Sequence, residues 1–256
     1  MTTPHRLAWA LPKAVGARSA TLLAAVFLLA GAAAALAFFP PAPPVAGRSD
    51  PQAAPAVTPE LRADFERWWD TQPRMTLPVS ADGAKVLILK FTDLQCPSCG
   101  LSHFAMKPKL AEYQSRYPGA VKLVTKDYPL QPECNPNVQR AVHLAACDAA
   151  AAVRMARQQG KGDALEEWFY ANQSSLTPMS VRQAAATIGG VTNFNAGLAT
   201  ALNGIRTDVG LGKLLGVTAT PTFYVNGVKC ESQGQPLATP FIFVAIEYEL
   251  RKAGLK

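Results

Sequence analysis

Two cysteines three residues apart are the residues of this chain best suited to redox chemistry. Cys96-Pro97-Ser98-Cys99 follows an apolar run over 86–91 and opens a segment with helical character. Thiols at this spacing lie close enough to form a small disulfide ring, and the N–H groups at the helix start stabilise a thiolate on the first. Because the thiolate is the reactive species in disulfide exchange, the pattern predicts one nucleophile and one resolving thiol.

The elements that must position these thiols follow one another in the order strand, helix, strand, helical block, hairpin and helix. A strand is predicted over 85–93, and its continuous apolar character indicates burial on both faces. The other predicted elements are a helix over 97–117, a strand over 121–126, a helical insert over about 138–215, a hairpin through Asn226-Gly227 and a helix over 239–251. This order predicts an α/β domain over residues 58–256, a sheet covered by helices.

An apolar segment near the N-terminus predicts that this domain is exported. Residues 20–39 carry no charged side chain, and as a helix they would extend about 30 Å, enough to cross a bilayer. Arg6, Lys13 and Arg18 precede the segment, so the positive-inside rule leaves residues 1–19 in the cytoplasm.

Two interpretations of the apolar segment stay open. It is predicted to be an uncleaved signal anchor, and the alternative is a signal peptide cut after the A-x-A pattern Ala35-Leu36-Ala37. Six prolines within residues 40–57 then predict an extended linker between membrane and domain. In both cases the compartment is oxidising, so disulfides persist there.

Composition argues against other classes of function. The formal net charge of +7 is spread along the chain, and no basic cluster interleaved with aromatic residues is present, so nucleic-acid binding is not expected. No Gly-rich phosphate loop occurs, and no second C-x-x-C is available to complete a zinc site. We therefore expect no metal and no cofactor beyond a redox-active disulfide.

Three segments together resemble the thioredoxin-like superfamily, specifically the exported DsbA-type thiol–disulfide oxidoreductases. These segments are 91–99, 126–130 and 217–227, and the helical insert between the second and third core strands matches the DsbA-type elaboration. Residues 134–148 look like the branch associated with vitamin K epoxide reductase-type membrane partners. The resemblance implies a thioredoxin-like fold, preceded here by a transmembrane helix.

The resemblance also implies roles for the residues of these segments. Cys96 would be the exposed nucleophile and Cys99 the resolving thiol, with Pro97 and Ser98 tuning the reduction potential. Thr220-Pro221 matches the family's cis-proline loop. Such a loop would bind an extended substrate peptide in the manner of an added strand.

One position departs from the family pattern. The family usually carries a buried acid six residues before the first cysteine, where this chain has Lys90. A buried lysine would favour the thiolate if it is charged, or act as a base if burial lowers its pKa. The alternatives are that Lys90 extends outward without a chemical role, or that Asp93, Asp127 or water carries the proton.

The remaining cysteines and His103 permit several interpretations. Cys134 and Cys147 are predicted to form a structural disulfide; a second redox pair, free thiols, or a metal site with His143 on a shared helix face are the alternatives. Cys230 is expected to be buried, because an accessible odd thiol beside a disulfide exchanger invites scrambling. His103 is expected to be packed or solvated, with electrostatic help to the thiolate as the alternative.

The sequence thus predicts an enzyme that introduces disulfides into exported proteins by exchange through Cys96 and Cys99. Its expected partners are reduced or misoxidised exported proteins and a quinone-linked membrane protein of the vitamin K epoxide reductase or DsbB kind. The expected location is the bacterial inner membrane, single-pass, with the catalytic domain in the periplasm or outside the cell, or free in the periplasm after signal cleavage. The alternatives are a reductase or isomerase of the same fold and a non-catalytic binding or chaperone module.

Overall fold

The structure, a computed structural model, describes residues 57–255 of the chain. The predicted cytoplasmic segment and signal anchor, and all but the last residue of the linker, lie outside the described residues. Over residues 57–255, no helix combines the length and the apolar character that crossing a bilayer requires.

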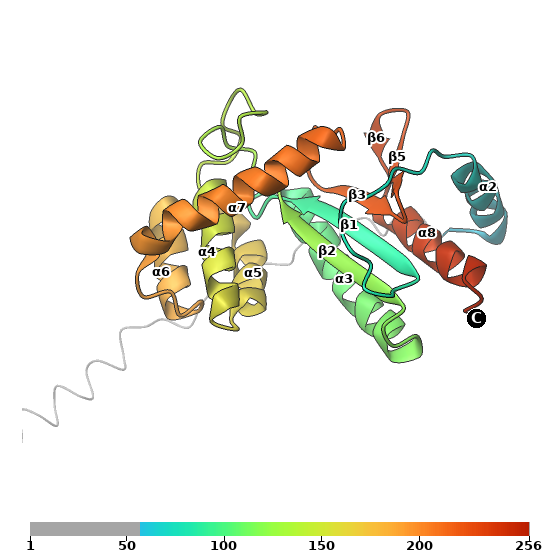
Figure 1. Ribbon diagram of the computed structural model, residues 1–256, viewed down its shortest axis with the longest axis horizontal. Coiled ribbons are helices and arrows are strands. Elements are labelled where there is room, and N and C mark those ends of the chain that lie inside the picture. The colour runs from blue at the N-terminus through green and yellow to red at the C-terminus, as the bar shows by residue number, and fades with distance from the viewer. Residues whose placement is uncertain (1–56, 256) are drawn as a thin grey trace, which may run out of the picture. The chain divides into compact units, whose positions relative to one another are not determined.

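A four-stranded mixed sheet in the order β2–β1–β3–β4 forms the centre of the domain (Figure 1). β1 (Val86–Thr92) pairs in parallel with β2 (Val121–Asp127) and antiparallel with β3 (Thr222–Val225). β3 turns through Asn226-Gly227 into β4 (Val228–Lys229). All residues of β1 are buried, which explains why this strand is a continuous apolar run rather than an alternating one.

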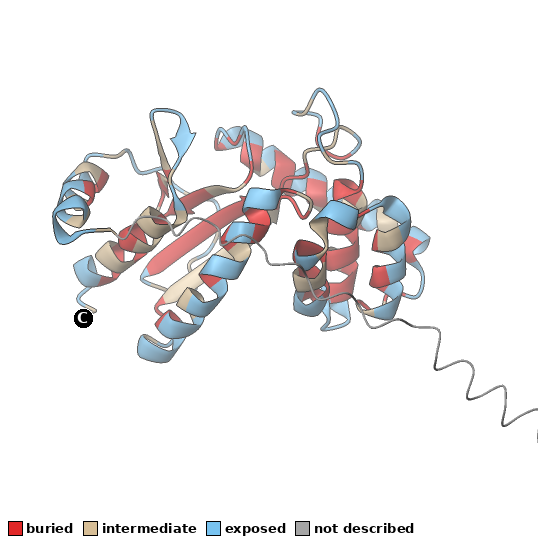
Figure 2. Ribbon diagram, turned by 180° about the vertical axis from the view of Figure 1, so that it is seen from behind, coloured by how far each residue is buried: buried red, intermediate tan, exposed pale blue. Residues whose placement is uncertain are grey.

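Successive side chains of β1 face two different cores, because strand side chains alternate between the faces of a sheet. Val86 and Ile88 pack with α3 (Pro97–Arg116) and α8 (Thr239–Lys252), and Leu89 and Phe91 pack with the helical block. Figure 2, seen from behind, shows the buried strands between these two groups of helices. By the same alternation Lys90 and Thr92 belong to the face that α3 covers.

The helical block between β2 and β3 is built around an alanine-rich central helix. This helix, α4, contacts α5, α6 and α7, and its row of buried alanines lets the neighbouring helices approach closely. The block comprises α4 (Ala146–Gln158), α5 (Gly162–Ala171), the 3₁₀ turn η1 (Gln173–Ser175), α6 (Pro178–Thr187) and α7 (Phe194–Leu214). α7 runs back over the sheet, where Gly212 allows contact because a Cβ there would lie 2.7 Å from the ring of Tyr128.

Helical structure begins later than the sequence pattern predicts. Residues 138–145 form an irregular loop, and α4 starts only at Ala146. The backbone N–H groups of Val142 and His143 both donate to the carbonyl of Leu130, at 3.0 and 3.3 Å, instead of entering a helix. The prediction that His143 shares a helix face with Cys147 is therefore wrong.

A buried carboxylate joins the N- and C-terminal parts of the domain. Glu249 on α8 accepts hydrogen bonds from the indole of Trp69 at 2.9 Å, from Arg74 at 2.6 Å and from the amide of Asn226 at 3.0 Å. Trp69 lies on α2 (Pro59–Asp70), and Asn226 lies in the turn between β3 and β4. A short hairpin, β5 (Glu231–Ser232) with β6 (Gln235–Pro236), completes the chain before α8.

Replacing this carboxylate should destabilise the domain strongly. Glu249→Ala leaves the Arg74 charge, the buried indole of Trp69 and the half-buried amide of Asn226 without their acceptor. We therefore expect a loss of about 3 kcal/mol in the free energy of unfolding. Urea denaturation followed by circular dichroism measures this loss. The matched control is Glu247→Ala on the same helix, whose ion pair with Arg62 is more exposed and which should cost less than about 1 kcal/mol. Equal losses in the two variants would contradict this assignment.

Candidate active site

The two thiols of the C-x-x-C motif lie at the junction of β1 and α3. Cys96 is the residue that precedes α3, Pro97 occupies the first helical turn, and Cys99 follows within that turn. The amide of Cys99 donates to the carbonyl of Cys96 at 3.0 Å, which closes the turn. Both cysteines are reduced and largely buried, with Cys96 5% exposed and Cys99 fully buried. The expectation that Cys96 is exposed is therefore wrong, because the residues of the helical block and Thr220 pack around it.

Cys96 lies among polar groups. Its Sγ lies 3.1 Å from the hydroxyl of Ser98, which can donate to the thiolate, and 3.2 Å from the carbonyl oxygen of Thr220, which accepts from the thiol form. The Thr220–Pro221 peptide bond is cis, as expected from the sequence. The hydroxyl of Thr220 is buried, and it has no hydrogen-bond partner among residues 57–255.

The pKa values of the two thiols move in opposite directions. A hydrogen bond from the Cys99 thiol, helped by the Ser98 hydroxyl and by Thr220, lowers the pKa of Cys96 to about 5, although burial opposes the shift. Burial, together with the interaction with Cys96, raises the pKa of Cys99 well above its ordinary value. At neutral pH the site therefore holds one thiolate and one thiol, the arrangement that disulfide exchange requires.

Asp93 organises the loop between β1 and Cys96. One carboxylate oxygen accepts from the amide of Gln95 at 2.7 Å, and the other accepts from the amide of Leu130 at 2.6 Å. The second oxygen also lies 2.9 Å from Nδ1 of His143. The hydrogen bond to Asp93 raises the pKa of His143, and the charge of Cys96 acts in the same direction.

Sequence analysis missed His143 as a member of this site, having considered it only as a metal ligand beside Cys147. The histidine comes from the irregular loop before α4, and no local pattern connects that loop with Asp93. When the imidazole is protonated, its positive charge and the charge of the Cys96 thiolate attract each other.

A disulfide between Cys134 and Cys147 fastens the two ends of this loop, with their Cα atoms 5.9 Å apart. The predicted bond is therefore present, and the alternatives of free thiols or a metal site at these cysteines are wrong, because the bond engages both sulfurs. Nearby, the amide of Ala145 donates to the side chain of Gln95 at 2.6 Å. The loop is thus tied both to itself and to the residue before Cys96.

The helical block also holds the active-site turn directly. The side-chain amide of Gln173 donates to the carbonyls of Leu94 and Cys96, at 3.0 and 2.7 Å. On α5, the hydroxyl of Tyr170 lies 2.7 Å from the hydroxyl of Thr92, in the interior beneath the thiols. Neither Gln173 nor Tyr170 is among the predicted site residues, because no local pattern connects them with the dithiol.

The other candidate residues lie in different surroundings. Lys90 is 3% exposed, so the hypothesis that it extends into solvent is wrong. The carboxylate of Asp127, considered above as a proton carrier, forms an ion pair with Arg154. Cys230 is buried as predicted, and burial raises its pKa. The ring of His103 packs against the ring of Tyr170, with centroids 4.6 Å apart, and burial lowers its pKa.

A family model described as Thioredoxin matches residues 78–238, which is more than half of the chain. The matched residues include the dithiol turn, Thr220 and Pro221. This chain belongs to the thioredoxin family. The thioredoxin-like α/β fold with a helical block between the second and third core strands, expected from the sequence, is confirmed.

Solved structures share this fold at low sequence identity. Oxidised BdbD from Bacillus subtilis is 20% identical and gives a TM-score of 0.50, with 70% of this chain and 93% of that chain covered. Alpha-DsbA1 from Wolbachia pipientis is 18% identical and also gives a TM-score of 0.50, with 71% and 97% covered. These likenesses agree with the DsbA-type form of the fold. The association with vitamin K epoxide reductase-type partners stays a prediction.

A curated relative shares a segment with this chain. The Na(+)/H(+) antiporter NhaA 3 of Salinispora tropica is 30% identical over 147 residues, which are 56% of this chain and 20% of the antiporter. The chain therefore spans about a fifth of the length of that relative.

Removing the resolving thiol should raise the pKa of the nucleophile. Cys99→Ala eliminates the largest contribution to the low pKa of Cys96, so that pKa should rise from about 5 by at least one unit. Ultraviolet absorbance of the thiolate against pH measures it. Cys230→Ala is the matched control and should leave the titration unchanged, because Cys230 packs in the other core. A Cys96 pKa that stays near 5 without Cys99 would contradict this account.

The charge of His143 should also act on Cys96. We expect His143→Ala to raise the pKa of Cys96 by roughly half a unit, because a protonated imidazole beside the thiolate is lost. His143→Gln keeps a hydrogen-bond donor toward Asp93 without the charge, and it should raise the pKa by a similar amount. Titration of Cys96 in the three proteins distinguishes the two contributions: a normal pKa in the Gln variant would assign the effect to loop geometry rather than charge.

Proposed function

We propose that this protein is an exported thiol–disulfide oxidoreductase that introduces disulfides into exported proteins. The observation that carries the proposal is the paired acidity of Cys96 and Cys99: a stabilised thiolate one helical turn from a buried, protonated thiol. The disulfide of these two cysteines would be the only redox group, with no metal, nucleotide or other cofactor.

Exchange would proceed through a mixed disulfide on Cys96. A substrate thiolate attacks Cys96 Sγ of the oxidised protein, the Cys96–Cys99 bond breaks, and Cys99 takes up a proton. A second substrate thiolate then attacks the substrate sulfur of the mixed disulfide, and Cys96 leaves as a stable thiolate. The substrate dithiol loses two electrons and the protein disulfide gains them. Thr220 and Pro221, beside Cys96, would contact the substrate chain.

The low pKa of Cys96 favours the oxidising direction. A thiolate with a pKa of about 5 stabilises the reduced protein at pH 7 by roughly 3 kcal/mol relative to a thiol of ordinary acidity, which corresponds to about 60 mV. A stabilised reduced form makes the disulfide a better oxidant. The alternative is a reductase or isomerase of the same fold fed by a membrane electron donor, and a second is a non-catalytic binding module with structural thiols.

We propose the following substrates, redox partner and location for this protein. Reduced or misoxidised exported proteins would be the substrates, and a quinone-linked membrane protein, similar to vitamin K epoxide reductase or DsbB, would reoxidise Cys96 and Cys99. The segment over 20–39 would hold the chain in the inner membrane, with the domain in the periplasm or outside the cell. Cleavage of that segment would release the domain into the periplasm instead.

The reduction potential tests the direction of electron flow. The purified full-length protein is equilibrated in graded glutathione buffers, and alkylated thiols are counted by mass. We expect a two-thiol transition near the oxidising end, at roughly −120 mV, with Cys134–Cys147 unchanged. A value near −270 mV would instead favour the reductase, and a four-thiol transition would make Cys134–Cys147 a second redox pair.

Turnover tests whether the thiols act catalytically at all. Oxidative refolding of a reduced, unfolded ribonuclease should be accelerated by the protein and not by Cys96→Ser, while Cys230→Ser retains the full rate. Unchanged activity in Cys96→Ser would favour the non-catalytic module.

A further inference from the structure

A buried lysine without a charged partner lies beneath the dithiol. Lys90 is 3% exposed, on the face of β1 that α3 covers. Its Nζ lies 5.5 Å from the ring centroid of Tyr170 and 5.7 Å from that of Phe223, and none of the ion pairs within residues 57–255 involves it. Burial of an unpaired ammonium group is costly. Burial accordingly lowers the pKa of Lys90, although the charges of Cys99, Glu166 and Cys96 oppose the shift.

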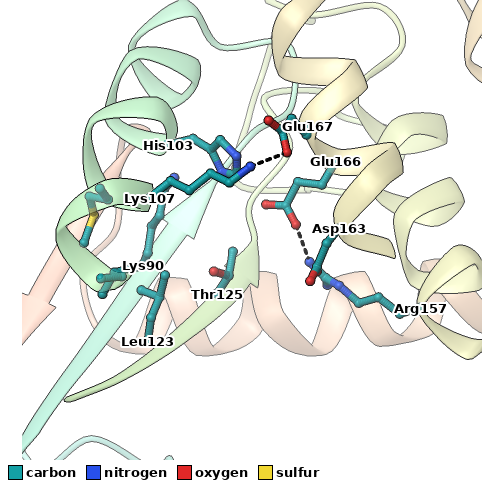
Figure 3. A pocket seen from close by; sticks show the side chains of 11 residues that line it. Lys90, His103, Lys107, Leu123, Thr125, Arg157, Asp163, Glu166 and Glu167 are labelled. Carbon is teal, nitrogen blue, oxygen red and sulfur yellow. Dashed lines mark hydrogen bonds and ion pairs between the residues drawn. The ribbon is translucent and has the colours of Figure 1, made fainter. Parts of the chain in front are cut away.

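A cavity of about 440 Å³ connects the surroundings of Lys90 with charged residues nearer the surface (Figure 3). It lies between α3, β2 and the helical block, and two ion pairs cross it: Lys107 with Glu167 at 2.5 Å, and Arg157 with Glu166 at 2.8 Å. The titratable and charged groups that face Lys90 around this cavity are His103, Lys107, Arg157, Asp163, Glu166 and Glu167.

On its other side Lys90 belongs to a polar cluster that reaches Cys99. Thr92 lies two residues along the same face of β1 and opposes the burial that raises the pKa of Cys99. Its hydroxyl lies 2.7 Å from the hydroxyl of Tyr170. The ring of Tyr170 in turn packs near Lys90 Nζ. Polar groups therefore lie between the resolving thiol and the amine beside the cavity.

Two other bases near the dithiol are already engaged. The carboxylate of Asp93 accepts from two backbone amides and contacts His143. Glu166 is paired with Arg157. His103 also lines the cavity, and its buried Nε2 has no hydrogen-bond partner among residues 57–255. Lys90 combines a buried, unpaired amine with access to the cavity and an interaction with the charge of Cys99.

We propose that Lys90 accepts the proton of Cys99 when Cys99 attacks, returns it when Cys99 leaves, and exchanges protons with water through the adjacent cavity. This role rests on the proposed exchange function, for which it supplies the route of the proton between Cys99 and water. It requires the amine to be neutral when Cys99 is about to attack the mixed disulfide, which its burial promotes.

The proposed step balances in both directions. With a mixed disulfide on Cys96, the Cys99 proton moves through the cluster to the Lys90 amine, and the Cys99 thiolate attacks Cys96 Sγ. The Cys96–Cys99 bond forms, the partner leaves as a thiolate, and the Lys90 ammonium releases its proton to water in the cavity. In the oxidising direction the Lys90 amine first takes up a proton from water in the cavity. A substrate thiolate then breaks the Cys96–Cys99 bond, and the Lys90 ammonium donates that proton to Cys99.

The experiment separates attack by Cys96 from attack by Cys99. The reduced full-length protein is mixed with one equivalent of an aromatic disulfide whose released thiolate is coloured. The first release reports attack by Cys96, and the second reports attack by Cys99 on the mixed disulfide. At pH 7, Lys90→Met should slow the second release by about tenfold or more while the first stays within about twofold. The difference should shrink as the pH rises and hydroxide replaces the amine.

Three further variants distinguish proton transfer from charge or packing. Lys90→Gln, also neutral, should reproduce the slow second release, and it serves if the Met variant does not fold. Lys90→Arg keeps a positive charge but cannot accept a proton, so it should not restore the rate. Lys107→Met removes a lysine at the cavity without removing the buried amine, and both releases should remain unchanged.

Two results would overturn the role of Lys90. One is a second release of normal rate in both Lys90→Met and Lys90→Gln; the other is a normal rate in Lys90→Arg. Failure of the proposed function would look different, because the wild-type protein would then show no rapid first release from Cys96.

Discussion

The hydrogen bond from the Cys99 thiol to the Cys96 sulfur is the interaction on which the rest of the site depends. It lowers the pKa of Cys96 only while Cys99 keeps its proton, and burial in turn holds that proton by raising the pKa of Cys99. The start of α3 brings the two sulfurs together and adds the dipole of the helix. The surrounding fold must therefore bury one thiol fully and leave polar groups around the other.

The helical block provides much of this surrounding. Through Gln173 it binds the carbonyls of the turn that holds Cys96, and through Tyr170 it closes the interior below Cys99. Its first loop, fastened by the Cys134–Cys147 disulfide, carries His143 to Asp93. The block is thus part of the site. Its contact residues lie far from the dithiol along the chain, so no local sequence pattern reveals that they belong to the site.

Two buried ionisable groups near the thiols, Asp93 and Lys90, have different surroundings. Two backbone amides donate hydrogen bonds to the carboxylate of Asp93, and these bonds offset the energetic cost of burying it. Lys90 forms no ion pair within residues 57–255; two aromatic rings lie near its amine, and a cavity lies beside it. A group that is buried but unpaired loses its charge easily, which suits exchange of a proton better than permanent ion pairing.

The helices and strands around the dithiol, and the reactive thiols themselves, were predictable from the sequence. β1 and α3 follow from an apolar run and a helical segment, the reactive pair follows from the spacing of Cys96 and Cys99, and the turn at Asn226-Gly227 follows from its dipeptide, because each signal is local. Tertiary structure decided what depends on distant contacts: the irregular loop before Ala146, the pairing of His143 with Asp93, and the cavity at Lys90. Burial and hydrogen bonding in these places come from residues far apart in the chain, and periodicity carries no information about which of them meet.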